Sequence, residues 1–129
     1  MSWPPRSVTT NQPGSMLSSG DVVGLDLGVP VGREAGFTHP AVVVTAQRIL
    51  DGAPSVIQVV PLTSTVRSFR SEVPIDADDA NGLVARSAAQ CQHVRAVSTG
   101  RVGSVQGNVG PIALSQVREV LALIFDLPA

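Results

Sequence analysis

The sequence predicts one α+β domain, a small and strongly bent antiparallel sheet close to an SH3-like barrel, with a helix at the C-terminus. Two patterns predict this fold class. Short β-branched runs bounded by prolines and glycines fill the chain after residue 20, and apolar residues take a helical spacing only near its end. The 129 residues, of which 43% are hydrophobic, can form one core but are too few for two. We therefore expect a single site per chain.

The N-terminal part has the composition of a chain that does not pack. Residues 1–19 contain three prolines and many Ser, Thr and Asn, with no periodic apolar pattern. We expect a flexible N-terminal extension there and a folded domain at residues 20–129. Residues 21–27 form a short apolar run, which predicts a strand, and residues 28–39 are dense in turn formers, which predicts a long loop.

Four further segments have strand patterns. Residues 40–45 and 55–63 are rich in β-branched side chains and are bounded or interrupted by proline. Residues 72–76 contain Pro74, which cannot donate to neighbours on both sides and so predicts an edge strand. Residues 90–97 alternate apolar and polar side chains, which predicts a single half-buried strand.

The C-terminal segment has a different periodicity. Ser115 is a candidate N-cap, and Pro128 would end the helix. The residues between them that share one helical face are Val117, Val120, Leu121, Ile124 and Leu127.

Composition excludes several classes of function. With 15% charged residues and a formal net charge of −1, the chain has no general basic field for duplex DNA, so any nucleic-acid site must be local. Cys91 is the only cysteine, which excludes an intramolecular disulfide and a cysteine-based zinc site and suits a reducing cytoplasm. No apolar run approaches the roughly 20 residues of a membrane span. We expect no metal, no cofactor and no membrane partner.

Four stretches, in this order, resemble the MazF/PemK toxins from Gly20 to Leu127. They are Gly20-Asp-Val-Val-Gly-Leu-Asp-Leu27, Gly32-Arg-Glu-Ala-Gly-Phe-Thr-His-Pro-Ala-Val-Val-Val44, Val59-Val-Pro-Leu-Thr-Ser64 and Cys91-Gln-His-Val-Arg-Ala-Val97, the last followed by Arg101-Val-Gly and the terminal helix. The resemblance implies a MazF/CcdB-like fold and a cytoplasmic toxin of a type II toxin-antitoxin system. It also implies a homodimer and a cognate MazE-like antitoxin.

The activity that the resemblance implies is cleavage of single-stranded RNA. The enzyme would be a sequence-selective, metal-independent endoribonuclease that leaves a 2′,3′-cyclic phosphate and a 5′-hydroxyl. In the family, an arginine just before the loop proline and the threonine of a Leu-Thr pair handle the scissile phosphate. Thr63 matches the threonine, whereas the arginine position holds His39, so the chain departs from the family at this position.

Histidine is suited to proton transfer because this residue type titrates near neutrality. His39 is therefore our candidate acid or base, and Arg33, in the same loop, is a candidate phosphate clamp because guanidinium matches phosphate oxygens. Each residue also has a structural interpretation: a hydrogen-bonded loop histidine, a solvated arginine, and for Thr63 a hydroxyl that pairs at a strand end.

Five more residues are candidates for RNA contact: Glu34, Phe37, Phe69, His93 and Arg95. The carboxylate would orient a base or contact RNA, the phenylalanines would stack nucleobases, and His93 with Arg95 would line, from one strand face, the shallow RNA groove that the resemblance implies. Ordinary loop or sheet-face packing is the alternative for all five.

Two other functions stay open. The same fold resembles the CcdB-type toxins, which bind DNA gyrase and cut no RNA, and fold alone does not fix function. The other is a catalytically weakened MazF relative, which the histidine at position 39 would indicate. We expect the antitoxin to bind as an extended acidic segment over residues 28–39 and to compete with RNA there.

Overall fold

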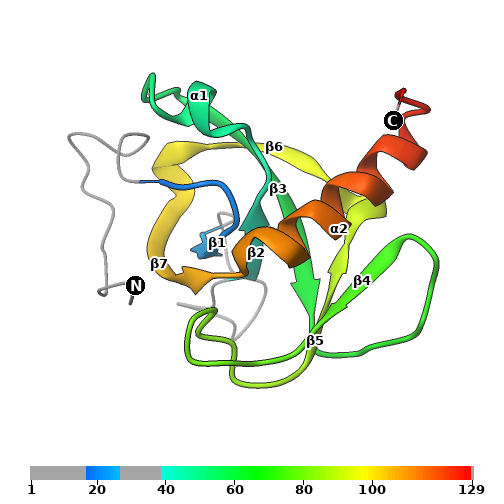
Figure 1. The fold of residues 1–129 in the computed structure, drawn as a ribbon. Helices are drawn as coiled ribbons and strands as arrows, with labels where there is room; N and C mark the ends of the chain where they lie inside the picture. Colours follow the sequence, from blue (N-terminus) through cyan, green and yellow to red (C-terminus); the bar gives the residue numbers. More distant parts are fainter. Residues whose placement is uncertain (1–16, 27–38, 129) are drawn as a thin grey trace, which may run out of the picture.

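The computed structural model describes residues 17–26 and 39–128. In chain order the elements are β1 (Asp21–Leu25), β2 (His39–Val43), α1 (Gln47–Leu50), β3 (Val56–Thr63), β4 (Glu72–Ile75), β5 (Ser87–Gln90), the 3₁₀ turn η1 (Cys91–His93), β6 (Arg95–Ser98), the 3₁₀ turn η2 (Thr99–Arg101), β7 (Val102–Asn108) and α2 (Gly110–Ile124). Figure 1 shows α2 crossing one side of the sheet.

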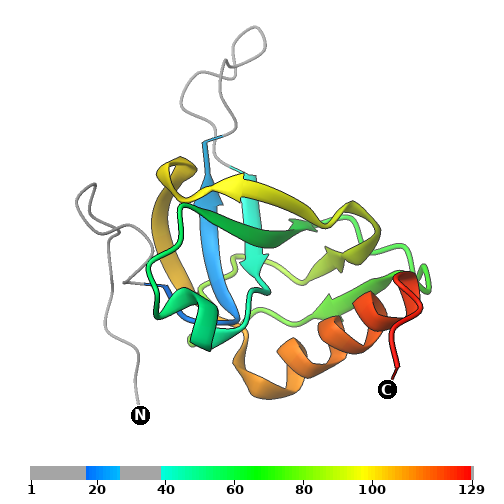
Figure 2. The ribbon, with the colours of Figure 1, turned by 90° about the horizontal axis from the view of Figure 1, so that it is seen from above.

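The sheet has seven strands in the described part of the chain, with the order β4-β5-β3-β2-β1-β7 and with β6 also paired to β3. The long strand β3 changes partner along its length. Its first half pairs with β6 from Val56 to Val59, and its end pairs with β5 at Leu62 and Thr63. This exchange curls the sheet, as the second view shows (Figure 2). The expected bent antiparallel sheet with a C-terminal helix is confirmed.

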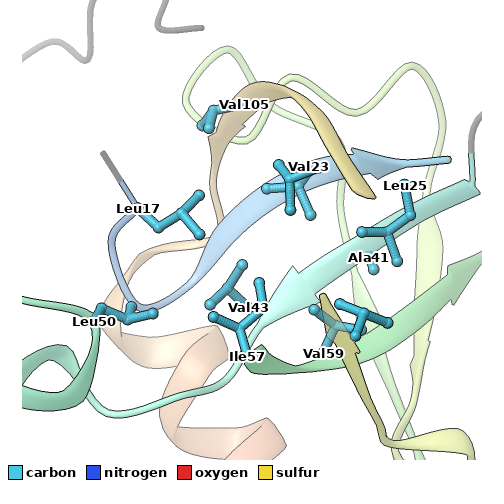
Figure 3. Packing of buried hydrophobic residues seen from close by; sticks show 11 residues of the cluster. Leu17, Val23, Leu25, Ala41, Val43, Leu50, Ile57, Val59 and Val105 are labelled. Carbon is cyan, nitrogen blue, oxygen red and sulfur yellow. The ribbon is translucent and has the colours of Figure 1, made fainter. Parts of the chain in front are cut away.

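Successive residues of the strands supply two separate hydrophobic clusters, as a period of two requires. In β1, Val23 packs inside the curl with Val43 and Ile57, among the residues drawn in Figure 3. Val22 points the other way and packs in a second cluster with Val117 of α2. Since the side chains of all five residues are fully buried, each contributes about 2 kcal/mol to stability.

Two sequence-based boundaries are wrong. The folded unit includes Leu17, which is buried in the first cluster, and Ser19, whose Oγ donates to the Thr45 carbonyl. The expected N-terminal extension therefore reaches three residues too far. The helix α2 begins at Gly110, five residues before Ser115, because Pro111 occupies its first turn, where a missing N–H costs nothing.

The expected single strand over residues 90–97 is also wrong. β5 ends at Gln90, and the chain turns through η1 before β6 begins at Arg95. Cys91 is buried and its N–H donates to the Ser71 carbonyl at 3.1 Å, while Val94 N–H donates back to Cys91 at 3.1 Å. These two bonds form a corner that lets the chain pass from one end of β3 to the other. Pro74 does lie on an edge strand, since within residues 17–26 and 39–128 β4 pairs only with β5.

Among residues 17–26 and 39–128, no helix is long and apolar enough to cross a membrane.

Candidate active-site groove

A groove of about 490 Å³ opens where β2 begins and β3 ends. Its volume lies in the range of sites that hold small ligands or single nucleotides. The lining comes from five parts of the chain, which are His39 and Pro40 of β2, Leu62, Thr63 and Ser64 at the end of β3, Gly82, Leu83, Val84 and Ala85 between β4 and β5, Ser87 at the start of β5, and Gln106 of β7. We call this feature the groove.

The register of the sheet brings His39 and Thr63 into the groove together. β2 and β3 are antiparallel and pair Ala41 with Pro61. In the same register, His39, two residues before Ala41, and Thr63, two residues after Pro61, occupy corresponding positions at this end of the two strands. His39 is exposed, and the Thr63 hydroxyl oxygen accepts a hydrogen bond from the Thr65 N–H at 3.1 Å. Since that bond uses only one lone pair of Thr63, its hydroxyl proton can be donated to a ligand.

The segment between β4 and β5 is held in shape by Asn81, which is fully buried. Its side-chain nitrogen donates to the Asp76 carbonyl at 2.8 Å, and its side-chain oxygen accepts from the N–H groups of Asp78 and Leu83 at 3.1 and 3.0 Å. A buried polar group with all its partners satisfied gives a well-defined backbone. Asn81 therefore fixes the backbone that leads into the wall of the groove, which is formed by Leu83, Val84 and Ala85.

The segment that leads into this wall, residues 80–82, contacts β7 directly. A Cβ atom at Gly82 would lie 2.3 Å from the Gln106 carbonyl oxygen, and one at Gly107 would lie 2.4 Å from the Ala80 carbonyl oxygen. Asn108 N–H donates to the Ala80 carbonyl at 2.9 Å. Only glycine permits such an approach of two backbones. The contact places Gln106 beside the groove although β7 lies at the far end of the strand order.

A second polar cluster lies at the other end of β4. Buried Glu72 accepts hydrogen bonds at Oε2 from Arg67 at 2.8 Å, Gln92 at 2.8 Å and Gln90 at 3.5 Å. Its Oε1 atom is buried and has no hydrogen-bond partner in the described part of the chain. The Gln92 hydrogen bond and the Arg67 guanidinium lower the pKa of the Glu72 carboxyl below its usual range, although burial acts in the opposite direction.

The remaining candidate residues lie away from the groove or outside the described chain. Phe69 is about half exposed, and the Arg67 guanidinium carbon lies 4.6 Å from its ring centre. His93 belongs to η1 and Arg95 to β6, where it pairs with Val59, four residues before Thr63. The expectation that His93 and Arg95 share one strand face is therefore wrong. Residues Arg33, Glu34 and Phe37 lie outside the described residues.

Sequence reasoning missed three contributors to the groove: Ser87, Gln106 and the Leu83 to Ala85 wall. One signal for the wall was available, because Asn81-Gly82 is a typical tight-turn dipeptide. No local pattern predicts that Gln106 lines the groove, since its position depends on the contact with Gly82, more than twenty positions away in the chain.

The groove offers an imidazole and a hydroxyl to one ligand. Such a pair can transfer protons and donate a hydrogen bond to a developing oxyanion, which suits attack on a phosphodiester. None of the described lining residues carries a permanent positive charge. In the described part of the chain, no three His, Cys, Asp or Glu side chains gather in a way that could hold a metal ion.

Comparison with known proteins identifies relatives along nearly the whole chain. The family model described as PemK-like, MazF-like toxin of type II toxin-antitoxin system matches residues 18–125. Endoribonuclease MazF9 of Mycobacterium tuberculosis is 33% identical over 119 residues, which cover 87% of this chain and 98% of that protein.

Solved structures share the fold at lower identity. Toxin MazF-mt6 of Mycobacterium tuberculosis has a TM-score of 0.68 and 23% identity, over 84% of this chain and 99% of the other. MazF of Deinococcus radiodurans has a TM-score of 0.67 and 22% identity, over 86% and 97%. An endoribonuclease from a mycobacterial species, solved in complex with its cognate antitoxin, has a TM-score of 0.66 and 21% identity, over 85% and 95%.

Proposed function

Because this chain belongs to the PemK-like, MazF-like toxins of type II toxin-antitoxin systems, we propose that it is an endoribonuclease that cuts single-stranded RNA. One observation supports this most directly. His39 and Thr63, which come from adjacent strand ends, line the same groove. The proposal places the activity in the cytoplasm, where a toxin of this kind meets messenger RNA.

The reaction uses the RNA's own 2′-hydroxyl. A base removes its proton, the 2′-oxygen bonds to phosphorus, and the bond from phosphorus to the 5′-oxygen breaks as that oxygen receives a proton. The products are a 2′,3′-cyclic phosphate and a 5′-hydroxyl. We assign one of the two proton transfers to His39, and a hydrogen bond from the Thr63 hydroxyl to a phosphate oxygen.

Positive charge at the phosphate is assigned to Arg33. The phosphorane carries additional negative charge, which a guanidinium stabilises with two parallel hydrogen bonds. None of the described residues that line the groove supplies this charge, and a histidine replaces the family's arginine at position 39. Glu34 and Phe37 are kept as proposed RNA contacts in the same segment, and Phe69, His93 and Arg95 as proposed contacts further along the bound strand.

The direct test is incubation of the purified protein with single-stranded RNA in EDTA. We expect cuts at defined sequences with cyclic phosphate ends, and no cut where the scissile nucleotide is 2′-deoxy. Loss of all activity in EDTA would overturn the metal-independent mechanism. A protein that cuts no RNA but inhibits DNA gyrase would instead be a CcdB-like binder. If only His39→Arg cuts RNA, the chain is a catalytically weakened relative.

We also propose a homodimer formed through α2. Five large apolar side chains of α2 and the residues after it are exposed, namely Ile112, Leu123, Ile124, Phe125 and Leu127. An apolar face of this kind on a small domain marks a protein contact, and a two-fold partner would cover it. Light scattering at micromolar concentration should give twice the chain mass, and Leu123→Lys should give the monomer. A monomeric wild type would contradict the proposal.

The partner that we propose is a MazE-like antitoxin. Structures of MazE-MazF from Deinococcus radiodurans are among those that share this fold. We expect an acidic extended segment of the antitoxin to cover residues 28–39 and to exclude RNA from the groove. Fluorescence competition between labelled RNA and an antitoxin peptide would test this, because simultaneous binding of both would contradict it.

A further inference from the structure

The part of the groove formed by β7 and by the segment between β4 and β5 has features that the cleavage reaction does not use. Gln106 is exposed on β7, and its side-chain amide makes no hydrogen bond to any other residue within 17–26 and 39–128. Beside it, Leu83 is half-buried and Val84 is fully exposed, at the tip of the segment between β4 and β5. An available amide therefore stands next to an apolar surface, and both line the groove that holds His39 and Thr63.

We propose that Leu83, Val84 and Gln106 form a base-recognition subsite, in which the Gln106 amide reads the edge of one unpaired nucleobase beside the cleaved phosphate. This inference rests on the proposed ribonuclease function and goes beyond it, because it names residues that determine which sequence is cut.

The chemistry of the wall fits a nucleobase better than a phosphate. An amide presents one donor and one acceptor side by side, which is the pattern that base edges complement, as in the pairing of glutamine with adenine. It carries no charge, and none of the described lining residues is an arginine that could bind a phosphate. The apolar side chains of Leu83 and Val84 offer a surface for the flat face of the base. Since base edges are available in unpaired RNA, the wall also suits a single-stranded substrate.

The subsite is built before any ligand binds. Gly82 and Gly107 let the wall and β7 approach so closely that a Cβ at Gly82 would meet the Gln106 carbonyl oxygen at 2.3 Å. The Asn108 N–H to Ala80 carbonyl hydrogen bond, 2.9 Å long, holds the two segments together. The backbones of Gly82 and Gln106 are thus held together, so little backbone ordering is needed at Gln106 when a base enters. Preorganisation of this kind increases discrimination between ligands.

The test is cleavage of a randomised single-stranded RNA pool, with the ends of the products sequenced. Wild type should prefer one base at a position adjoining the cut. In Gln106→Ala that preference should fall roughly tenfold or more, the effect expected when a two-hydrogen-bond base contact is lost. Preferences at the other positions should be retained. Gln106→Glu should move the preference towards cytosine, whose N4 amine donates to a carboxylate.

Ser104→Ala is the matched control, because Ser104 is exposed on the same strand but does not line the groove. It should leave every preference unchanged. If Gln106→Ala fails to fold, Gln106→Glu carries the same test with a side chain of equal length. An active Gln106 variant with wild-type preferences at all positions would overturn the subsite and leave the proposed function standing. A wild-type protein that cuts no RNA would overturn the proposed function itself, and the subsite with it.

Discussion

His39, the first residue of β2, and Thr63, the last residue of β3, line one groove because the antiparallel register of these strands brings their ends together. Neither residue alone indicates chemistry. Because both residues line one groove, the presence of His39 in place of the family's arginine bears directly on how this chain would cleave RNA.

If His39 transfers a proton, His39→Ala should lower the single-turnover cleavage rate by roughly a hundredfold or more, the usual effect of removing a general acid or base. RNA affinity should change much less. The rates of wild type and His39→Arg should depend differently on pH, because a guanidinium stays protonated and cannot serve as the proton acceptor. An active His39→Ala protein with the wild-type pH profile would mean that Arg33 is the principal group and His39 is structural.

Thr63→Val keeps the shape of the side chain and removes only its hydroxyl. We expect a loss of roughly tenfold to several hundredfold in kcat/KM, because one hydrogen bond to a charged transition state is removed. Thr65→Val is the control, since Thr65 is exposed nearby and does not line the groove. A Thr63→Val protein that cleaves RNA as fast as wild type would contradict this role of the hydroxyl.

Gly82 has a positive φ of 69°, and a side chain there would meet the Gln106 carbonyl at 2.3 Å. Gly82→Ala should therefore lower the free energy of unfolding by about 2 kcal/mol or more. Gly100→Ala is the comparison, because its nearest contact would be Ser98 Oγ at 3.5 Å, and it should change stability by about 0.5 kcal/mol or less. Urea unfolding of both variants measures the difference. Equal stability would contradict the close packing of the wall on β7.

The parts of the fold that sequence predicted are those in which local pattern and tertiary structure agree. Residues 56–63 carry β-branched side chains in a long strand, and the apolar spacing up to Ile124 is that of α2. β7 was missed because its two glycines and polar residues do not resemble a strand, although it pairs with β1 along its length. Its place is set by this pairing and by the close approach that Gly107 permits, both of which are long-range contacts.

The candidate site also has residues that local patterns predict and residues that only long-range packing brings together. Thr63 and His39 were chosen from short motifs, and the structure places both in the groove. His93 was chosen from an alternation that includes Cys91 and Val97, both of which are buried, but a turn lies between them. The alternation therefore predicted correctly which side chains are buried, but it predicted wrongly that residues 90–97 form one continuous strand. Gln106 had no local signal because only the packing of the wall brings it to the groove.

Cys91 should be chemically silent in the folded protein. Burial raises the pKa of its thiol to about 11, and its sulfur lies near the carbonyl oxygens of Ala89 and Val117 at 3.8 and 3.9 Å. Because the thiolate is the reactive form, a thiol reagent at neutral pH should label the protein only as it unfolds. Labelling in urea should follow the unfolding curve. Rapid modification without urea would contradict the burial of this corner between β5 and β6.

Glu72 should make stability depend on acid pH. The hydrogen bond from Gln92 and the charge of Arg67 hold its pKa in the folded state below the value of about 4.3 for a free glutamate. A depressed pKa contributes stability that is fully present above the unfolded-state value and is lost as pH falls through the folded-state value. The free energy of unfolding should therefore decrease more steeply below about pH 4.3 in wild type than in Glu72→Gln, which cannot titrate. Asp51→Asn, which changes an exposed carboxylate, serves as the control and should keep the wild-type slope. Parallel slopes for wild type and Glu72→Gln would mean that the three donors around Glu72 do not favour its charged form.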